Sequence, residues 1–160
     1  MREKELISFV VMAYNDQANI PRTIEAITAL DDLGQHEIIV VYDGSHDRPV
    51  SIATSETVRL IELGTNCGRE FARDRGIAEA RREDIAAVDA DIILPPDRLV
   101  PTRAAIEKHS AVGGTPVPDG DVAYIYRKFR LAPRFVGNTT TVTDNIGLYL
   151  RKVFELVRFA

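Results

Sequence analysis

The 160-residue sequence has no tryptophan, one cysteine and no excess of basic residues. An internal disulfide needs two cysteines, so the single cysteine, Cys67, excludes such a bond. It also agrees with a reducing compartment. The net charge of −4 argues against a nucleic-acid partner, whose phosphates are bound by clustered lysine and arginine. No apolar run reaches the length of a transmembrane helix, and the charged N-terminus is followed by only a short apolar run. We therefore expect a cytoplasmic protein without a signal peptide or a transmembrane segment.

The remaining composition predicts one domain with its own hydrophobic core. Of the residues, 45% are hydrophobic and 28% are charged, which is typical of globular proteins. A chain of this length buries roughly 70% of its unfolded surface, so it needs no disulfide or metal ion to fold. We expect residues 1–160 to form a single domain.

Four short apolar runs predict the strands of a mainly parallel sheet. These runs are Leu6–Met12, Glu37–Tyr42, Val58–Leu63 and Asp84–Val88. One helix, with Asn19 as its cap, is predicted between the first two strands. A second is predicted over Gly68–Arg82, where Ala72, Gly76 and Ala80 form a face that fits closely against a sheet. Strands joined by helices of these lengths need crossover connections, which favour an α/β fold.

The pattern is weaker beyond Pro101. The predicted elements there are a helix (Thr102–His109), an edge strand (Ala111–Val117), a helix (Asp121–Phe135), a strand (Thr139–Thr143) and a final helix (Tyr149–Phe159). The final helix has an apolar face made by Leu150, Val153, Phe154 and Val157. This face either covers the sheet or contacts a second copy in a homodimer. Since such faces more often complete a core, we expect the first.

Three of the predicted strands end in polar residues. Tyr14 and Asn15 follow the first strand, Asp43 follows the second, and Asp89 and Asp91 follow the fourth. Each of these residues taken singly is better explained as a turn former or a solvated side chain. Parallel strands, however, place their carboxyl ends at one edge, where ligands bind in open α/β sheets. We therefore expect these side chains to converge on one site.

The chemistry of these residues suits a nucleoside diphosphate and a divalent cation. Asp89 and Asp91 offer the oxygen ligands that a hard cation prefers, although Asp-X-Asp alone is weak evidence. The Tyr14 ring offers a surface for a base to stack on, worth about 1–3 kcal/mol. Asp43 offers an acceptor for an N–H group of the base.

Two arginines follow a glycine at the start of the second predicted helix. Free backbone N–H groups and the helix dipole favour an anion at Gly68-Arg69. Arg69 and Arg73 lie four residues apart and share a helix face. Contact with phosphate and a solvated cationic face are equally good interpretations of this pair.

Other well-known nucleotide and hydrolase motifs are absent from the sequence. No Gly-X-Gly-X-X-Gly follows the first strand, and no Gly-X-X-X-X-Gly-Lys-Ser/Thr occurs, which disfavours dinucleotide dehydrogenases and P-loop NTPases. The Gly-X-Ser-X-Gly nucleophile elbow is also missing. The absence of a glycine- and arginine-rich loop after the first strand disfavours a nucleotidyltransferase.

Four segments occur in a characteristic order and spacing: Ile7–Asn15, Glu37–Asp47, Asn66–Gly76 and Val88–Leu99. Together they resemble family 2 glycosyltransferases of the GT-A fold. The resemblance covers residues 6–99 and implies a three-layer α/β sandwich with a mainly parallel, Rossmann-like sheet. It also implies a UDP- or GDP-linked sugar donor, an acceptor that the sequence does not identify, and Mn²⁺ or Mg²⁺. Residues 1–100 would then bind nucleotide and metal, and 101–160 would form a shortened acceptor side.

The resemblance also implies a role for each residue at the strand ends. Those implied to bind the nucleotide sugar are Ala13, Tyr14, Asn15, Asp43, Arg69 and Asp89. The first three would line the nucleoside pocket, and Asp43 would hydrogen-bond the base. Asp89 would lie beside the ribose and the metal, and Asp91 would coordinate the metal that bridges the diphosphate. Such a metal neutralises the charge that develops on the departing diphosphate.

The sequence departs from the family in two places. Tyr42 stands where the family commonly has an additional aspartate, so base recognition is expected to differ. Inverting transfer needs a carboxylate base, which the family places in a later segment. The sequence ends near the point where that segment should begin, and Asp119, Asp121 and Asp144 match no base motif. We assign no catalytic base, and a truncated or non-catalytic nucleotide-diphosphate-binding relative is the alternative to an active transferase.

Overall fold

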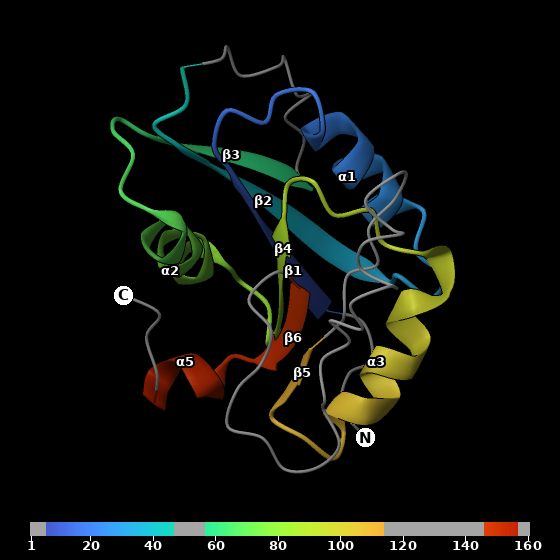
Figure 1. Cartoon of the computed structure of the whole chain (residues 1–160). Helices are drawn as coiled ribbons and strands as arrows, with labels where there is room; N and C mark the ends of the chain where they lie inside the picture. The colour runs from blue at the N-terminus through green and yellow to red at the C-terminus, as the bar shows by residue number, and fades with distance from the viewer. Residues whose placement is uncertain (1–5, 47–56, 114–145, 157–160) are drawn as a thin grey trace, which may run out of the picture.

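A computed structural model describes residues 6–46, 57–113 and 146–156 and shows a six-stranded sheet between two helical layers (Figure 1). The strands are β1 (Leu6–Ala13), β2 (Gln35–Asp43), β3 (Val58–Leu63), β4 (Asp84–Asp89), β5 (Ala111–Gly113) and β6 (Ile146–Leu150). Their order in the sheet is β3-β2-β1-β4-β6-β5. The first four run parallel, whereas β6 is antiparallel to β4 and to β5. The predicted α/β fold with a mainly parallel sheet is confirmed.

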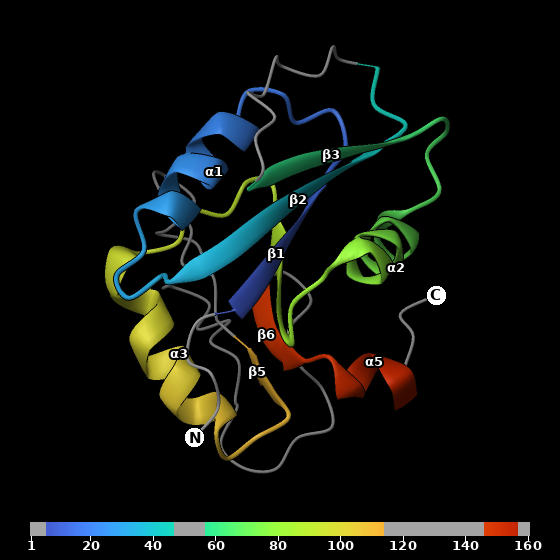
Figure 2. The same cartoon turned by 180° about the vertical axis from the view of Figure 1, so that it is seen from behind.

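Within the described residues, helices cover both faces of the sheet (Figures 1 and 2). The helices are α1 (Ile20–Thr28), α2 (Arg69–Glu79), α3 (Leu99–Ile106) and α5 (Lys152–Leu156), with a 3₁₀ turn at Pro96–Arg98. Phe9 and Val11 of β1 pack in the core on the α1 and α3 side, whereas Val10 and Met12 pack in the core on the α2 side. Burial on both faces explains why the central strands read as continuous apolar runs. In the part of the chain that the structure describes, no helix is both long and apolar enough to cross a bilayer.

Helix α2 lies close to the sheet because one of its faces has small side chains. Ala72 and Gly76 are buried there, and a Cβ atom on Gly76 would lie 2.3 Å from Val10 Cγ1 and 3.0 Å from Val41 Cγ2. The predicted small face is confirmed. The helix is shorter than predicted, since Ala80 already has an extended backbone (φ −66°, ψ 140°).

A buried polar cluster lies at the C-terminal end of α2, near the start of β1 and β2. Glu37 Oε1 accepts hydrogen bonds from Ser8 Oγ at 2.7 Å and from the Arg81 amide at 2.6 Å. Glu37 Oε2 accepts one from Arg59 Nη2 at 3.1 Å. Burial by itself raises the pKa of Glu37, but these hydrogen bonds and the charges of Arg59 and Arg81 outweigh burial and lower the pKa below its ordinary value.

The prediction for the C-terminal segment is wrong at its start. Tyr149 and Leu150 belong to β6, and the helix begins at Lys152. Leu148 and Leu150 pack in one core cluster and Tyr149 in the other, so this segment alternates with the period of a strand. Val153 packs against the same core clusters, as we expected of the apolar face.

Other predicted boundaries need smaller corrections. Helix α3 begins at Leu99, three residues before the predicted start, and ends at Ile106. The predicted edge strand is confirmed at Ala111–Gly113. Asn19 holds the cap position of α1 but makes no side-chain cap bond. Its side-chain Nδ2 donates instead to Asp16 Oδ1 at 2.6 Å. The predictions that fall outside the described residues concern 114–117, Asp121–Phe135, Thr139–Thr143, 157–159, Asp119 and Asp144.

Candidate functional site

The carboxyl ends of β1, β2 and β4 meet at one edge of the sheet. In the register of the strands, Ala13 pairs with Tyr42 and Met12 pairs with Asp89. Strands β1, β2 and β4 therefore end at nearly the same height along the sheet, to within about one residue. The structure brings the predicted strand-end residues together, as the parallel order requires.

Asn15 connects the turn after β1 to the turn after β2. Its backbone has φ +52°, and its backbone N–H donates to Ser45 Oγ at 3.0 Å. Its side-chain Oδ1 accepts from the backbone N–H of His46 at 2.8 Å. Ala13 is buried beside it, whereas Tyr14 is 47% exposed. The aromatic ring of Tyr14 is thus available to a ligand at this edge, while Asn15 holds the two turns together.

Asp43 binds the backbone at the start of α2. The side chain is buried, with 4% of the residue exposed. Its Oδ1 accepts from the Cys67 amide at 2.7 Å, and its Oδ2 accepts from the Gly68 amide at 2.9 Å. The prediction that backbone N–H groups are free for a ligand anion is therefore wrong for Gly68. The anion at this helix end is a carboxylate of the chain itself.

Gly44 lets the turn after β2 pack against the segment before α2. It has φ +62°, and a Cβ atom there would lie 2.2 Å from the Asn66 backbone nitrogen. Only glycine fits this position without displacing that backbone. Sequence reasoning identified Asp43-Gly44 as a turn but missed this contact with a segment more than twenty residues away.

The two arginines of α2 have different surroundings. Arg69 has a side chain that is 41% exposed, and its Nη1 lies 3.6 Å from Asp89 Oδ2. Arg73 is 1% exposed. The interpretation of the pair as a solvated cationic face is therefore wrong for Arg73. Arg69 brings positive charge to the edge where the acidic pair begins.

Asp89 is the last residue of β4, and Asp91 lies in the turn that follows it. The Asp89 side chain is 19% exposed and lies on the α2 side, and Asp91 is exposed in the turn. Among the described residues, no group of three or more histidine, cysteine, aspartate or glutamate side chains could hold a metal ion. One or two carboxylates are what Mg²⁺ uses when phosphate oxygens of a substrate complete its coordination. The pair therefore fits a cation that is bound together with a diphosphate.

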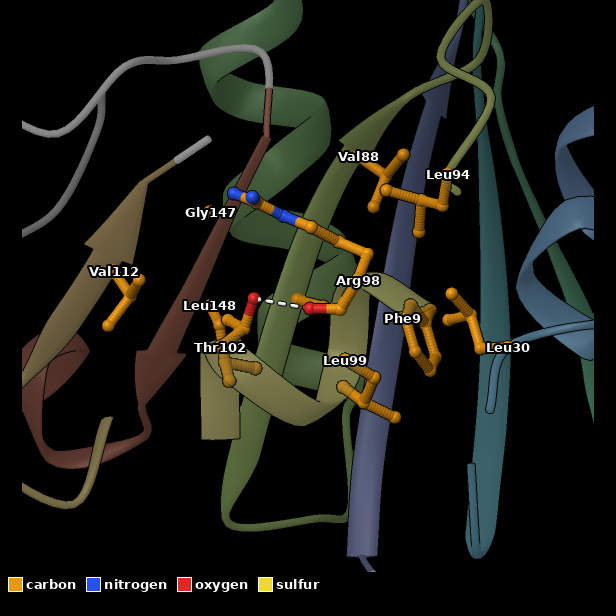
Figure 3. A pocket seen from close by; sticks show the side chains of 11 residues that line it. Phe9, Leu30, Val88, Leu94, Arg98, Leu99, Thr102, Val112, Gly147 and Leu148 are labelled. Atoms are coloured by element: carbon orange, nitrogen blue, oxygen red, sulfur yellow. Dashed lines mark hydrogen bonds between the residues drawn. The ribbon is translucent and has the colours of Figure 1, made fainter. Parts of the chain in front are cut away.

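The structure also has a small cavity on the other face of the sheet. Its volume is about 40 Å³, and it lies among Phe9, Leu99 and Leu148, with the Arg98 side chain across it (Figure 3). Thr102 Oγ1 donates to the Arg98 carbonyl at 2.8 Å on one side of it. None of the predicted site residues lines it.

The sequence matches glycosyl transferase family 2 over residues 8–156, nearly the whole chain. The chain belongs to this family. The predicted family is confirmed.

Two curated relatives illustrate the range of this glycosyltransferase family. The succinoglycan biosynthesis protein ExoO of Rhizobium meliloti is 39% identical over 110 residues, covering 67% of this chain and 30% of ExoO. The undecaprenyl-phosphate 4-deoxy-4-formamido-L-arabinose transferase of Aeromonas hydrophila is 33% identical over 120 residues, covering 68% of this chain and 36% of the transferase. The chain thus spans only about a third of the length of these relatives.

Solved glycosyltransferase structures share the fold. The mannosyltransferase PcManGT of Pyrobaculum calidifontis, in complex with GDP-Man and Mn²⁺, aligns with a TM-score of 0.72 at 21% identity, covering 94% of this chain and 46% of PcManGT. S. aureus TarS in complex with UDP-GlcNAc aligns with a TM-score of 0.57 at 24% identity, covering 71% of this chain and 37% of the TarS chain. At these identities the comparison confirms the GT-A fold.

Proposed function

We propose that the chain binds a nucleotide-sugar donor together with a divalent cation and transfers the sugar to an acceptor hydroxyl with inversion. The observation that carries the proposal is the position of Asp89 and Asp91 at the end of β4. They share an edge with the exposed Tyr14 ring and with Arg69. Those groups match the parts of a nucleoside diphosphate: a base, a diphosphate and its counter-ion.

The proposed donor is linked to UDP or GDP. PcManGT, which shares the fold, is complexed with GDP-Man and Mn²⁺, and TarS is complexed with UDP-GlcNAc. In this chain the Tyr14 ring would stack on the base, and Ala13 and Asn15 would line the nucleoside pocket. Asp43 has two remaining acceptor directions, since each carboxylate oxygen can accept more than one hydrogen bond. One of them would receive an N–H group of the base.

The proposed cation is Mn²⁺ or Mg²⁺, held by Asp91 and Asp89 and completed by diphosphate oxygens. A bound cation of this kind stabilises the negative charge of a leaving diphosphate. Arg69 lies beside Asp89 and would neutralise part of the same charge through a charge-assisted hydrogen bond to a phosphate oxygen. The chain's own residues thus hold the leaving group and orient the donor.

The alternative function is binding of a nucleoside diphosphate without catalysis. Inverting transfer requires a carboxylate base. The alternative is favoured because no carboxylate among the described residues matches such a base.

Turnover separates the two functions. UDP- and GDP-linked sugars are incubated with the chain and Mn²⁺, and release of UDP or GDP is followed with and without acceptors. The acceptor panel also includes a polyprenyl phosphate, which would accept the sugar through a phosphate oxygen in place of a hydroxyl, because the Aeromonas hydrophila relative is an undecaprenyl-phosphate transferase. Release that requires Mn²⁺ and is abolished in Asp91→Ala supports transfer. Binding of UDP or GDP with no release from any donor contradicts it and supports the alternative.

A further inference from the structure

Helix α2 is capped by a strand residue instead of by its own first residue. The cap position is Gly68, which has no side chain and makes no side-chain cap bond. The two carboxylate oxygens of Asp43, at the end of β2, accept from the amides of Cys67 and Gly68 at 2.7 and 2.9 Å. Hydrogen bonds to a buried carboxylate at the positive end of a helix dipole are among the stronger ones in proteins.

The segment before α2 is fixed from two further directions. The Asn66 side-chain oxygen also accepts from the Gly68 amide, at 3.1 Å. The Thr65 and Asn66 backbone packs so closely on Gly44 that a Cβ atom there would lie 2.2 Å away. The turn at the end of β2 therefore determines where α2 begins.

The next residue after this fixed turn is Arg69. Its guanidinium reaches across to β4, with Nη1 at 3.6 Å from Asp89 Oδ2. Since a long arginine side chain can adopt many rotamers, the direction of its backbone decides which of them reach Asp89. The contacts run from Asp43 through Gly68 to Arg69 and so link the end of β2 to the end of β4.

We propose that Asp43 is a positioning residue of the donor site, and that it acts through Arg69. This role is additional to contact with the base and rests on the proposed binding of a nucleoside diphosphate. By holding the Cys67 and Gly68 amides, Asp43 keeps Arg69 aimed at the diphosphate. A change at Asp43 therefore weakens binding of the diphosphate itself, including that of a ligand that has no base.

The first test is amide hydrogen exchange on the full chain in the absence of ligand. In Asp43→Asn, at least one of the Cys67 and Gly68 amides exchanges at least tenfold faster than in the unaltered chain, because an NH₂ group replaces one of the two carboxylate oxygens that accept from them. Asp31→Asn makes the same chemical change at an exposed position between α1 and β2, and it leaves these amides unchanged. Unchanged exchange in Asp43→Asn overturns the proposal without reference to any nucleotide.

The second test is a double-mutant cycle on affinity, with Mn²⁺ present and UDP, GDP and inorganic pyrophosphate as probes. Asp43→Asn and Arg69→Met each weaken binding of the diphosphates and of pyrophosphate about tenfold. If Asp43 acts through Arg69, adding Asp43→Asn to Arg69→Met weakens binding by less than about threefold more. The proposal is overturned if the double variant loses affinity by the product of the two single losses, since the two residues then act independently. It is also overturned if Asp43→Asn binds pyrophosphate as tightly as the unaltered chain.

Two outcomes keep the inference separate from the proposed function. If the unaltered chain binds none of the probes, the proposed function fails and the role of Asp43 in it fails as well. If the unaltered chain binds but the cycle is additive, only the inference fails. Asn66→Ala removes the weaker acceptor of the Gly68 amide and serves as a milder variant if Asp43→Asn does not fold. It is expected to give a smaller loss of diphosphate affinity that is likewise suppressed by Arg69→Met, and an undiminished loss contradicts the proposal.

Discussion

Arg69 and Asp89 join the first turn of α2 to the end of β4, with 3.6 Å between Nη1 and Oδ2. The arginine neutralises a carboxylate that is only 19% exposed, where an unpaired charge is costly. In the proposed site, a divalent cation at Asp89 would compete with Arg69 for the same oxygens. The pair would then link metal binding to the position of the cationic side chain that we propose for the diphosphate.

Arg69→Met is expected to have opposite effects on the two ligands. Nucleoside diphosphate binds about tenfold more weakly, because a charge-assisted hydrogen bond is lost. Mn²⁺ alone binds at least as tightly as before, because its competitor at Asp89 is gone. Calorimetric titration measures both. Arg75→Met is the matched control, since Arg75 lies on the same helix and pairs with Glu79 at 2.9 Å, away from the edge.

Asp91→Ala is expected to remove the metal dependence of nucleotide binding. Without this ligand, the affinity for a diphosphate in Mn²⁺ falls to the affinity measured without Mn²⁺, since one carboxylate holds the ion too weakly. Asp97→Ala, an exposed carboxylate on the same connection, is expected to keep the dependence. Metal-dependent binding that survives in Asp91→Ala shows that the metal assignment is wrong.

Gly76→Ala is expected to destabilise the fold by about 1–3 kcal/mol, the usual cost of adding atoms to a packed core. The new methyl group would lie 2.3 Å from Val10 Cγ1, which must move or push α2 away from the sheet. Gly64→Ala is the control, because a Cβ atom there meets nothing within 4 Å. Urea denaturation measures both free energies of unfolding, and equal values for the two variants contradict the close packing.

Glu37→Gln is expected to destabilise the chain near neutral pH by about 1.5–3 kcal/mol, the value of hydrogen bonds to a charged group. The folded-state pKa of Glu37 lies below its ordinary value. Its carboxylate therefore contributes stability that is fully present above the unfolded pKa of about 4.3 and is lost as the pH falls through the folded pKa.

The difference in unfolding free energy between the unaltered chain and Glu37→Gln should shrink as the pH is lowered from 7 toward 3. Glu62→Gln changes an exposed glutamate on the neighbouring strand and should show little difference at any pH. A Glu37→Gln difference that stays constant across this range contradicts the role given to the ionised carboxylate.

The sequence predicted those features that depend on local pattern. The runs at Leu6–Met12 and Glu37–Tyr42 are buried on both faces, so their composition alone indicated central strands. The small residues around Gly76 predicted close packing of α2. Tyr149 and Leu150 were misassigned because a strand and a helix follow each other at once, and apolar residues of both were counted as one helical face.

The contacts of the site depended on partners far away in the sequence. Asp43 was correctly placed at the functional edge, but its bonds to Cys67 and Gly68 join residues 24 and 25 positions apart. Arg69 and Arg73 share one helix pattern, yet one is half-exposed beside Asp89 and the other is buried. Such differences arise from packing between elements, which no local pattern encodes.

The central claim is that this edge of the sheet binds a nucleoside diphosphate through a divalent cation. Calorimetric titration of the chain with UDP, GDP, ADP and CDP, each with and without Mn²⁺, tests it most directly. We predict that UDP or GDP binds at least tenfold more tightly with Mn²⁺ than without it, and more tightly than the other diphosphates. Binding of no diphosphate in the presence of Mn²⁺, or equal affinity with and without the metal, would contradict the account.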